Sequence, residues 1–391
     1  MSDVIFGRAG PEDRDDCIDF AEFVFSQAHE PHDFLGLLPK LYKPEYFMEG
    51  THYLAKEGGK IKALVGSYPI KYEFDGAQTL PGRGIGAVSV HHRSRSKGYM
   101  KVLMNMALED MKKNGMTFSC LGGQRQRYEY FGYTHAGTRY YFTVREPNIR
   151  HTLGNEWKTD LALRKVMAED KIILDQIQAI HDAKKAKLFR DRSRLFDILS
   201  SWYANIFAVT EGDRFSGYFV ARPGSFDVVE INLNDLSRIP EIMGLFLRYL
   251  KERGGPDSVS VAAAPHETEK ITVLSGFAEN YRQTTAYQFN ILNFESFVKP
   301  FLDLGAEQHA IIDGSIILEI KGSGIFALEC KGGKAAISRT TLAPDLVLNE
   351  LEAVQFLFNP VSPITSAKIR ESLFLRSLLP LPLFFENLDG I

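Results

Sequence analysis

A basic turn that contains glycine separates an apolar strand from a helix in the first quarter of the chain. Residues 87–90 are an apolar segment of strand length, and residues 100–108 place apolar side chains at helical spacing. The turn between them, with Arg95 and Gly98, must lie at a helix N-terminus, where unpaired N–H groups and the helix dipole favour negative charge. Gly98 lets a phosphate approach the backbone. The turn predicts an anion site, and the alternative interpretation is a solvated basic turn that binds nothing.

The segment downstream of this turn is rich in aromatic residues. Residues 117–121 are typical of a buried strand and are followed by a Gly-Gly pair, a short aromatic segment and a second strand at residues 140–144. Phe131 and Tyr133 are typical core aromatics. Tyr128 precedes them on the same segment.

The spacing Arg95-x-x-Gly98-x-Met100 resembles the pyrophosphate loop of the GNAT superfamily of acyl-CoA-dependent N-acyltransferases, although Met100 stands where that pattern has Gly or Ala. The resemblance implies that backbone amides after Arg95 hold the CoA pyrophosphate. It also implies that a strand edge pairs with the pantetheine arm of the cosubstrate, acetyl-CoA. The predicted cofactor-binding residues are Val88, Ser89, Val90, Arg95, Ser96, Lys97, Gly98, Tyr99, Met100 and Lys101.

A wider set of residues looks like the Eis (enhanced intracellular survival) family of acetyltransferases, and the length of 391 residues also fits that family. The residues that carry the resemblance are Gly86, Ala87, Val88, Ser89, Val90, Arg95, Gly98, Tyr128, Phe131, Gly132 and Tyr133. The fold class it implies is α/β and α+β: two tandem GNAT folds, each a mixed, splayed β-sheet flanked by helices, then a sterol-carrier-like α+β domain. The predicted domains are residues 1–150, 151–290 and 291–391. The resemblance also implies a homo-oligomer such as a hexamer.

The same resemblance implies a base and an acid for direct acetyl transfer. An amine must lose its proton before it attacks a thioester, because such amines are mostly protonated at pH 7. In the Eis family the C-terminal carboxylate reaches the transfer site, and Ile391 would supply it here, where the family usually ends in an aromatic residue. Tyr128 would then protonate the departing thiolate. A surface tail without chemistry is the alternative interpretation of the C-terminus.

Other parts of the sequence are expected to position these groups. A helix over residues 15–27 and the aromatic segment 28–50 would form the wall of the acceptor site, as in GNAT enzymes. The predicted substrate contacts there are Glu30, Asp33 and Phe34, with Tyr42 and Phe47 as further candidates. Core aromatics and solvated acids are the alternative for each. A hairpin of strands 52–56 and 60–74 would turn at Gly58-Gly59.

The middle third repeats this order without a basic turn. The patterns predict helices over residues 171–187, 193–201 and 239–253, and strands over 226–233, 258–263 and 285–292. An acidic segment with Asp235 replaces the basic turn, so this copy should not bind CoA and should have a structural role.

Beyond residue 294 the pattern changes to α+β. It predicts strands over 311–320, 324–330 and 334–338 and helices over 345–357 and 366–375. Residues 379–391 are apolar and aromatic, which predicts a buried tail.

Composition narrows the function classes. The chain has 46 basic and 49 acidic residues, so its net charge of −3 favours neither nucleic-acid nor membrane partners. Cys17, Cys120 and Cys330 form no CxxC pair, and no leader or apolar run of membrane-spanning length is present, which predicts a soluble cytoplasmic protein. His91-His92 has no ligand-spaced partners, so no metal is expected.

The sequence therefore predicts an acetyl-CoA-dependent N-acetyltransferase whose acceptor is an amine of a small molecule or peptide, such as an aminoglycoside, a polyamine or lysine. The alternatives are a non-catalytic protein that binds an apolar ligand and an acyltransferase that uses a longer acyl-CoA.

Overall fold

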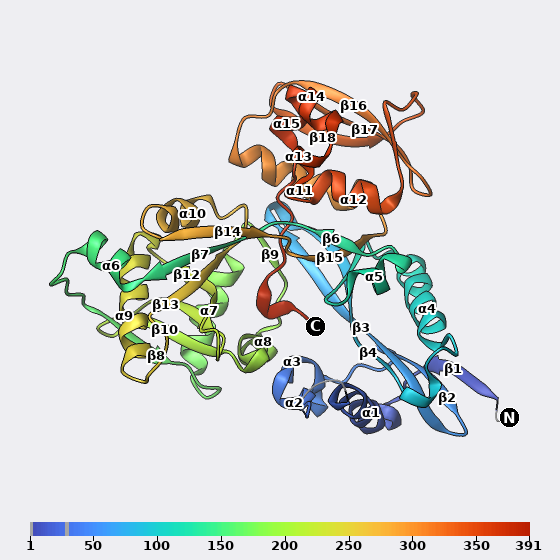
Figure 1. Cartoon of the computed structure of the whole chain (residues 1–391), viewed down its shortest axis with the longest axis horizontal. Helices are drawn as coiled ribbons and strands as arrows, with labels where there is room; N and C mark the ends of the chain where they lie inside the picture. The colour runs from blue at the N-terminus through green and yellow to red at the C-terminus, as the bar shows by residue number, and fades with distance from the viewer. Residues whose placement is uncertain (1–2, 28–30) are drawn as a thin grey trace. The chain divides into compact units, whose positions relative to one another are not determined.

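Two compact units, each with a mixed β-sheet, make up the chain. The computed structural model in Figure 1 describes residues 3–27 and 31–391. Unit 1 comprises Met1–Gly137, Tyr287–Leu383 and Gly390–Ile391, and unit 2 comprises Thr138–Ala286 and Phe384–Asp389. Among the described residues, no helix combines the length and the apolar character that a membrane crossing requires.

The main sheet of unit 1 begins with four antiparallel strands. The strand order is β1 (Val4–Arg8), β2 (His52–Glu57), β3 (Lys60–Phe74), β4 (Gln78–Val90), β5 (Phe118–Leu121), β15 (Tyr287–Ile291) and β6 (Thr134–Ala136). The predicted hairpin turn between β2 and β3 is confirmed: Gly58 and Gly59 have φ of +59° and +75°, values that glycine adopts without steric cost. β4 and β5 run parallel.

Helices pack on this sheet through apolar faces. The long one, α4 (Tyr99–Lys113), buries Tyr99, Leu103, Met104, Ala107 and Met111, whose spacing places them on one side of a helix. They pack with Tyr53, Ala55, Ala63, Val65 and Ile85 of the strands. The other helices of this region are α1 (Arg14–Ser26), α2 (Phe34–Leu37), α3 (Pro39–Tyr42) and α5 (Arg125–Tyr128).

The two sheets exchange strands between the first and the second half of the chain. The predicted strand at 140–144 is β7 (Arg139–Arg145), and it pairs with strands of unit 2 and not with β5. The predicted strand at 285–292 is β15, which pairs with β5 and β6, and the unpredicted strand β14 (Asn280–Thr284) just before it pairs with β7. The exchange explains why packing divides the chain after Gly137 and Ala286, whereas the predicted domain boundaries are 150 and 290. A strand pattern in the sequence shows which residues form a strand, but not which sheet that strand joins.

The sheet of unit 2 is covered on both faces. Its order is β14, β7, β13 (Ser258–Ala263), β12 (Val228–Leu233), β11 (Arg214–Ala221), β10 (Asn205–Glu211) and β8 (Leu161–Lys165). Alternate residues enter different cores: Phe207 and Phe219 pack with α9 (Ile239–Lys251), and Ile206 and Tyr218 pack with the helices of the other face. Those helices are α7 (Lys171–Asp182) and α8 (Leu195–Ser200), and Figure 1 shows α9 on the opposite side of the strands. The remaining elements are α6 (Glu146–Leu153), β9 (Ala186–Leu188) and α10 (Thr268–Ser275).

The C-terminal part of unit 1 is α+β, as predicted. Its sheet has the order β18 (Lys334–Arg339), β17 (Gly324–Lys331), β16 (Gly314–Ile320) and β19 (Leu346–Leu348), with helices α11 (Phe294–Gln308), α12 (Glu350–Phe358), α13 (Ser362–Thr365), α14 (Ala367–Glu371) and α15 (Leu373–Leu378). The predicted helix at 345–357 begins only at Glu350, because the Asn349 side chain caps it there. The sterol-carrier-like identity of this part stays a prediction.

The apolar tail is buried, as predicted. Leu381, Leu383 and Leu388 have no exposed surface, and Phe384 and Phe385 are 2% and 3% exposed. Residues 384–389 pack in unit 2, and the last two residues pack in unit 1.

Candidate active site

The loop before α4 has the backbone geometry of an anion site. Gly98 has φ +81° directly before the helix, and Ser96 has φ +65° two residues earlier. Left-handed residues in a tight loop turn successive N–H groups toward one side. A Cβ on Gly98 would meet no atom within 4 Å, so this side of the loop is open.

A cleft of about 770 Å³ opens at this loop. Three cationic side chains, Arg95, Lys101 and Arg127, line it, and its described lining residues include no acid. Of the ten predicted cofactor residues, eight line the cleft: Val88, Val90, Arg95, Ser96, Gly98, Tyr99, Met100 and Lys101. The cleft therefore combines apolar and cationic surface, which suits an anion with an apolar arm.

The other two predicted cofactor residues point elsewhere. Ser89 is 1% exposed and its hydroxyl donates to the Ala87 carbonyl, because side chains alternate along the strand. Lys97 pairs with Glu57 at 3.2 Å. Arg127 also lines the cleft but is not among the cofactor residues predicted from the sequence.

A β-bulge interrupts the strand that lines the cleft. Leu64 pairs with Ser89 and Gly66 with Gly86, so Ala87 and Val88 together face the single residue Val65. Ala87 has φ +50°. A bulge leaves one residue without its ladder hydrogen bonds, so backbone N–H here is available to a ligand.

Strands β4 and β5 separate just before the bulge. Their parallel pairing runs from Gly82 and Phe118 to Ile85 and Leu121. Beyond that point β4 continues to Val90, whereas β5 ends and the chain turns at Gly122 and Gly123. We call this divergence the splay of unit 1.

Ile391 lies on the β4 side of this splay. Side chains at Gly84 or Gly86 would overlap that of Ile391, so the two glycines make room for it. Lys40, only 5% exposed, donates from Nζ to the Gly390 carbonyl at 2.7 Å. The Tyr287 hydroxyl lies 3.4 Å from the Ile391 carbonyl oxygen. The sequence interpretation missed both Lys40 and Tyr287.

Tyr128 lies on the β5 side. Its ring packs against Gly123, where a Cβ would overlap it, and the residue is 7% exposed. Burial raises the pKa of its phenol, an effect that the charge of Arg127 partly offsets. The hydroxyl therefore keeps its proton at neutral pH. Since the Tyr287 hydroxyl also lies over Gly122, the glycine pair after β5 brings Tyr128 and Ile391 to the same splay.

A buried chain of hydrogen bonds runs beside Ile391. The Thr51 hydroxyl donates to the Met48 carbonyl, so it accepts from His52 Nδ1 at 3.1 Å. His52 Nε2 then accepts from the Tyr68 hydroxyl at 3.0 Å, and the Tyr68 oxygen accepts from Tyr42 at 2.9 Å. Burial lowers the pKa of His52 to about 4, which keeps the imidazole neutral.

The predicted substrate contacts have other partners or lie outside the described residues. Glu30 lies outside them. Asp33 caps α2 by accepting from the Gly36 N–H at 2.8 Å. Phe34 is 5% exposed and packs against Tyr42, with ring centroids 5.1 Å apart, so it belongs to the core. Neither Asp33 nor Phe34 lines the cleft.

Comparisons with known proteins agree with this geometry. Residues 7–136 match the family model described as an acetyltransferase (GNAT) domain. No curated protein sequence matches significantly. Solved structures with the same overall fold include a GCN5-related N-acetyltransferase from Kribbella flavida, at 16% identity and TM-score 0.65, covering 100% of this chain and 99% of that one. A probable N-acyltransferase from Enterococcus faecalis, a conserved protein of unknown function, has 16% identity and TM-score 0.66, with 98% of both chains covered.

Eis1 from Mycobacterium abscessus is also similar, with 14% identity, TM-score 0.63 and complete coverage of both chains. Identities this low show a shared fold, and the family model shows the domain. The predicted GNAT acetyltransferase is confirmed. Residues 7–136 form an acetyltransferase domain of the GNAT family, in a chain that has the fold of Eis1.

Proposed function

We propose that the protein transfers an acetyl group from acetyl-CoA to an amine of a small molecule or peptide by direct attack. GNAT domains catalyse acyl transfer, and the finer assignment rests on one observation. A cleft lined by three cations and no described acid leads from an open N–H loop to a splay beside which Tyr128 and Ile391 lie.

The cleft would hold the cosubstrate through its charges and its strand edge. Pyrophosphate would accept hydrogen bonds from the amides around Gly98, with Arg95, Lys101 and Arg127 as counter-charges. The pantetheine arm would lie along Val88 and Val90, which line the same cleft.

The bulge and Tyr128 would act on the thioester. An N–H left unpaired at Ala87 and Val88 can donate to the carbonyl oxygen as negative charge develops there. Tyr128 would give its phenolic proton to the departing sulfur, and the raised pKa of this phenol keeps that proton available at neutral pH.

The Ile391 carboxylate would accept the proton that the amine loses as the N–C bond forms. Lys40, the two glycines of β4 and Tyr287 hold the last two residues at the splay, which supports this role. A positioned carboxylate removes the proton without help from bulk water.

The packing below the splay favours a short acyl group. Tyr72, Phe118 and Phe297 are fully buried there, and a Cβ on Gly82 would already overlap Phe118. An acyl chain that extended from the splay along the paired part of these strands would meet these buried rings. We therefore propose acetyl-CoA and not a longer acyl-CoA as the donor.

Thiol release tests the donor and the reaction. The protein is mixed with acetyl-CoA or myristoyl-CoA and a panel of aminoglycosides, polyamines and lysine peptides, and free CoA thiol is measured. Amine-dependent release with acetyl-CoA is expected. If neither donor binds by calorimetry, the proposed function is wrong, and if only myristoyl-CoA reacts, the donor is wrong.

A C-terminal amide made by semisynthesis tests the base at nearly constant volume. We expect kcat to fall by about 10²-fold, the low end for a general base, with acetyl-CoA affinity unchanged. Full kcat in the amidated protein would exclude the carboxylate. The neutral imidazole of His52, reached through the Tyr68 hydroxyl, would then be the next candidate.

The homo-oligomer and the cytoplasmic location stay predictions. Light scattering of the purified chain tests the first.

A further inference from the structure

A buried cluster of charges in unit 2 holds the C-terminal segment of the chain. Arg190, whose side chain has no exposed surface, donates to two carboxylates at once. Its Nη1 and Nη2 lie 2.9 and 2.7 Å from the two oxygens of Glu230. Its Nε and Nη2 lie 3.2 and 2.7 Å from Asp389 Oδ2. One guanidinium thus joins the middle of the sheet to a residue two positions before Ile391.

A second ion pair holds the same segment. Lys184 Nζ lies 2.7 Å from Glu386 Oε1, and the other Glu386 oxygen accepts from the Leu188 N–H at 3.1 Å. Of the acids around the two cations, Glu386 and Asp389 belong to the tail, and Glu230 and Glu267 belong to the rest of unit 2. The Tyr218 hydroxyl and the Asn232 side-chain amide also donate hydrogen bonds to Glu230 Oε1.

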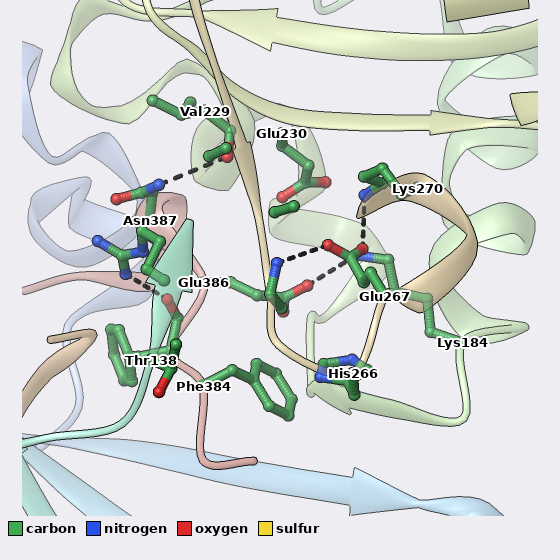
Figure 2. Close-up of a pocket in the computed structure, with 15 residues that line it drawn as sticks. Thr138, Lys184, Val229, Glu230, His266, Glu267, Lys270, Phe384, Glu386 and Asn387 are labelled. Carbon is green, nitrogen blue, oxygen red and sulfur yellow. Dashed lines mark hydrogen bonds and ion pairs between the residues drawn. The ribbon is translucent and has the colours of Figure 1, made fainter. Parts of the chain in front are cut away.

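The held segment, residues 384–389, lies where the strands of unit 2 separate. β12 and β13 are parallel and share a single register pair, Val228 with Val261. Asn387 reaches the Val229 carbonyl at 3.5 Å, and the Phe384 ring packs on His266, just past β13, with centroids 4.4 Å apart. Figure 2 shows Asn387 beside Val229 and Glu386 near Lys184 and Glu267. Only about 40 Å³ stays open there.

We propose that Arg190 is a positioning residue for acetyl transfer, because it fixes the segment that carries the Ile391 carboxylate. The inference rests on the proposed role of that carboxylate. Two residues span at most about 7 Å, so the position of Asp389 limits where the Ile391 carboxylate can lie. The place where β12 and β13 separate, the splay of unit 2, binds residues 384–389 of the chain's own tail and not CoA.

Asp389→Asn is the cleanest test, because it removes a charge from the tail and leaves the Arg190–Glu230 pair in the sheet. The first measurement is release of Ile391 by carboxypeptidase, followed by mass spectrometry. We expect release to accelerate by at least about 10-fold in Asp389→Asn and in Arg190→Gln. Arg190→Lys, which keeps the charge but loses the planar fork, should be intermediate.

Kinetics provide the second measurement. In Asp389→Asn and in Arg190→Gln, kcat should fall by about 10-fold, within the range that a misplaced general base can cost. The KM for acetyl-CoA should stay unchanged. Arg192→Gln is the matched control, since Arg192 is partly exposed and pairs with Asp175 on the surface of the same unit. It should change neither release nor kcat.

The outcomes separate this inference from the proposed function. Normal release or normal kcat in Asp389→Asn would overturn the positioning role. If the amidated protein retains full kcat, the carboxylate is not the base, and the proposed chemistry fails even where Asp389→Asn accelerates release. If amidation abolishes transfer and Asp389→Asn has no effect, the chemistry stands and the Arg190 inference fails.

Discussion

The two splays of the molecule start from the same strand arrangement and end in opposite states. In unit 1, β4 and β5 diverge beside a cleft of about 770 Å³ with a basic, glycine-containing loop at the start of α4. In unit 2, β12 and β13 diverge around residues 384–389, and the loop before α9 carries Asp235, whose side chain accepts from the Ser237 N–H. The first splay can admit a ligand, and the second is filled by the chain itself.

The difference lies in a few residues and not in the fold. Gly98 provides a left-handed position with open space, whereas in the corresponding turn of unit 2 an Asp235 oxygen already accepts from the Ser237 N–H. Arg190 and Lys184 make the second splay favourable for carboxylates of the tail. The separation of two parallel strands thus creates a site in each unit, and the charges of nearby side chains determine what occupies it.

Gly98→Glu should have the largest effect, because it places a side chain and a negative charge in the open splay. Loss of two charge-assisted hydrogen bonds, at about 1.5–3 kcal/mol each, predicts roughly 10³-fold weaker acetyl-CoA binding by calorimetry. Gly254→Glu is the matched control, since Gly254 also has positive φ and open space but lies in unit 2. Unchanged affinity in Gly98→Glu would remove the anion site.

Tyr128→Phe should lower kcat by about 10²-fold without changing KM for acetyl-CoA. The effect lies at the low end for general acids, because a thiol with a pKa near 8.5 leaves without full protonation. Since the pKa of this phenol is raised, the activity that depends on it should persist through pH 9 and decline only above about pH 10.

Tyr133→Phe is the control for that variant. The Tyr133 hydroxyl bonds Ser119 Oγ at 2.7 Å, so its loss should cost about 1 kcal/mol of stability and leave kcat intact. The opposite pattern, with Tyr128→Phe less stable but fully active, would make the Tyr128 hydroxyl structural.

Gly86→Ala should reduce kcat by about 10-fold, because the added methyl group overlaps Ile391 and displaces it from the splay of unit 1. Calorimetry should show normal acetyl-CoA affinity. Gly7→Ala in β1 has no atom within 4 Å of the new Cβ and should be neutral. Equal kcat in both variants would mean that the position of Ile391 does not matter.

The smallest effect is a pH dependence of the tail in unit 2. Burial disfavours the Glu386 charge, but Lys184 and Arg190 outweigh it and hold the pKa at about 2, below its ordinary 4.5. An acid with a lowered pKa contributes stability above its unfolded value and loses it as pH falls through its folded one. The protection factor of the Leu388 amide, its intrinsic exchange rate divided by its observed rate at the same pH, should therefore fall between pH 4.5 and 2, and less so in Glu386→Gln.

Local patterns predicted the parts of the site that are contiguous in sequence. The turn with Arg95 and Gly98 and the helix after it have a signature of their own, since an apolar strand, a glycine and a helical period follow within 20 residues. The buried tail was also predictable, from its composition. The exchange of β7 and β15 between the two sheets could not be predicted from the sequence. Both sheets contain apolar strands next to which β7 could pair, and the sequence pattern does not distinguish between them.

Residues that act across long separations left no signal in a single sequence. Lys40 meets Gly390 across 350 positions, and Arg190 meets Asp389 across 199. Lys40 stands between apolar residues and Arg190 begins a charged run, so in the sequence each has the pattern of an ordinary surface charge. A buried cation does indicate a partner, but only the fold reveals the burial. Phe34 is the converse case, an aromatic residue in a segment expected to bind substrate that packs in the core instead.

The exchange of strands has a consequence for synthesis on the ribosome. The first sheet needs β15, which is completed at Ile291, whereas β6 ends at Ala136. At about 5–20 residues per second, translation of the intervening stretch takes roughly 8–30 s. During that interval β5 has an unpaired edge, which is a hazard for aggregation. Truncation of the chain near residue 137 would make this state permanent, so the GNAT domain should be expressed together with β15.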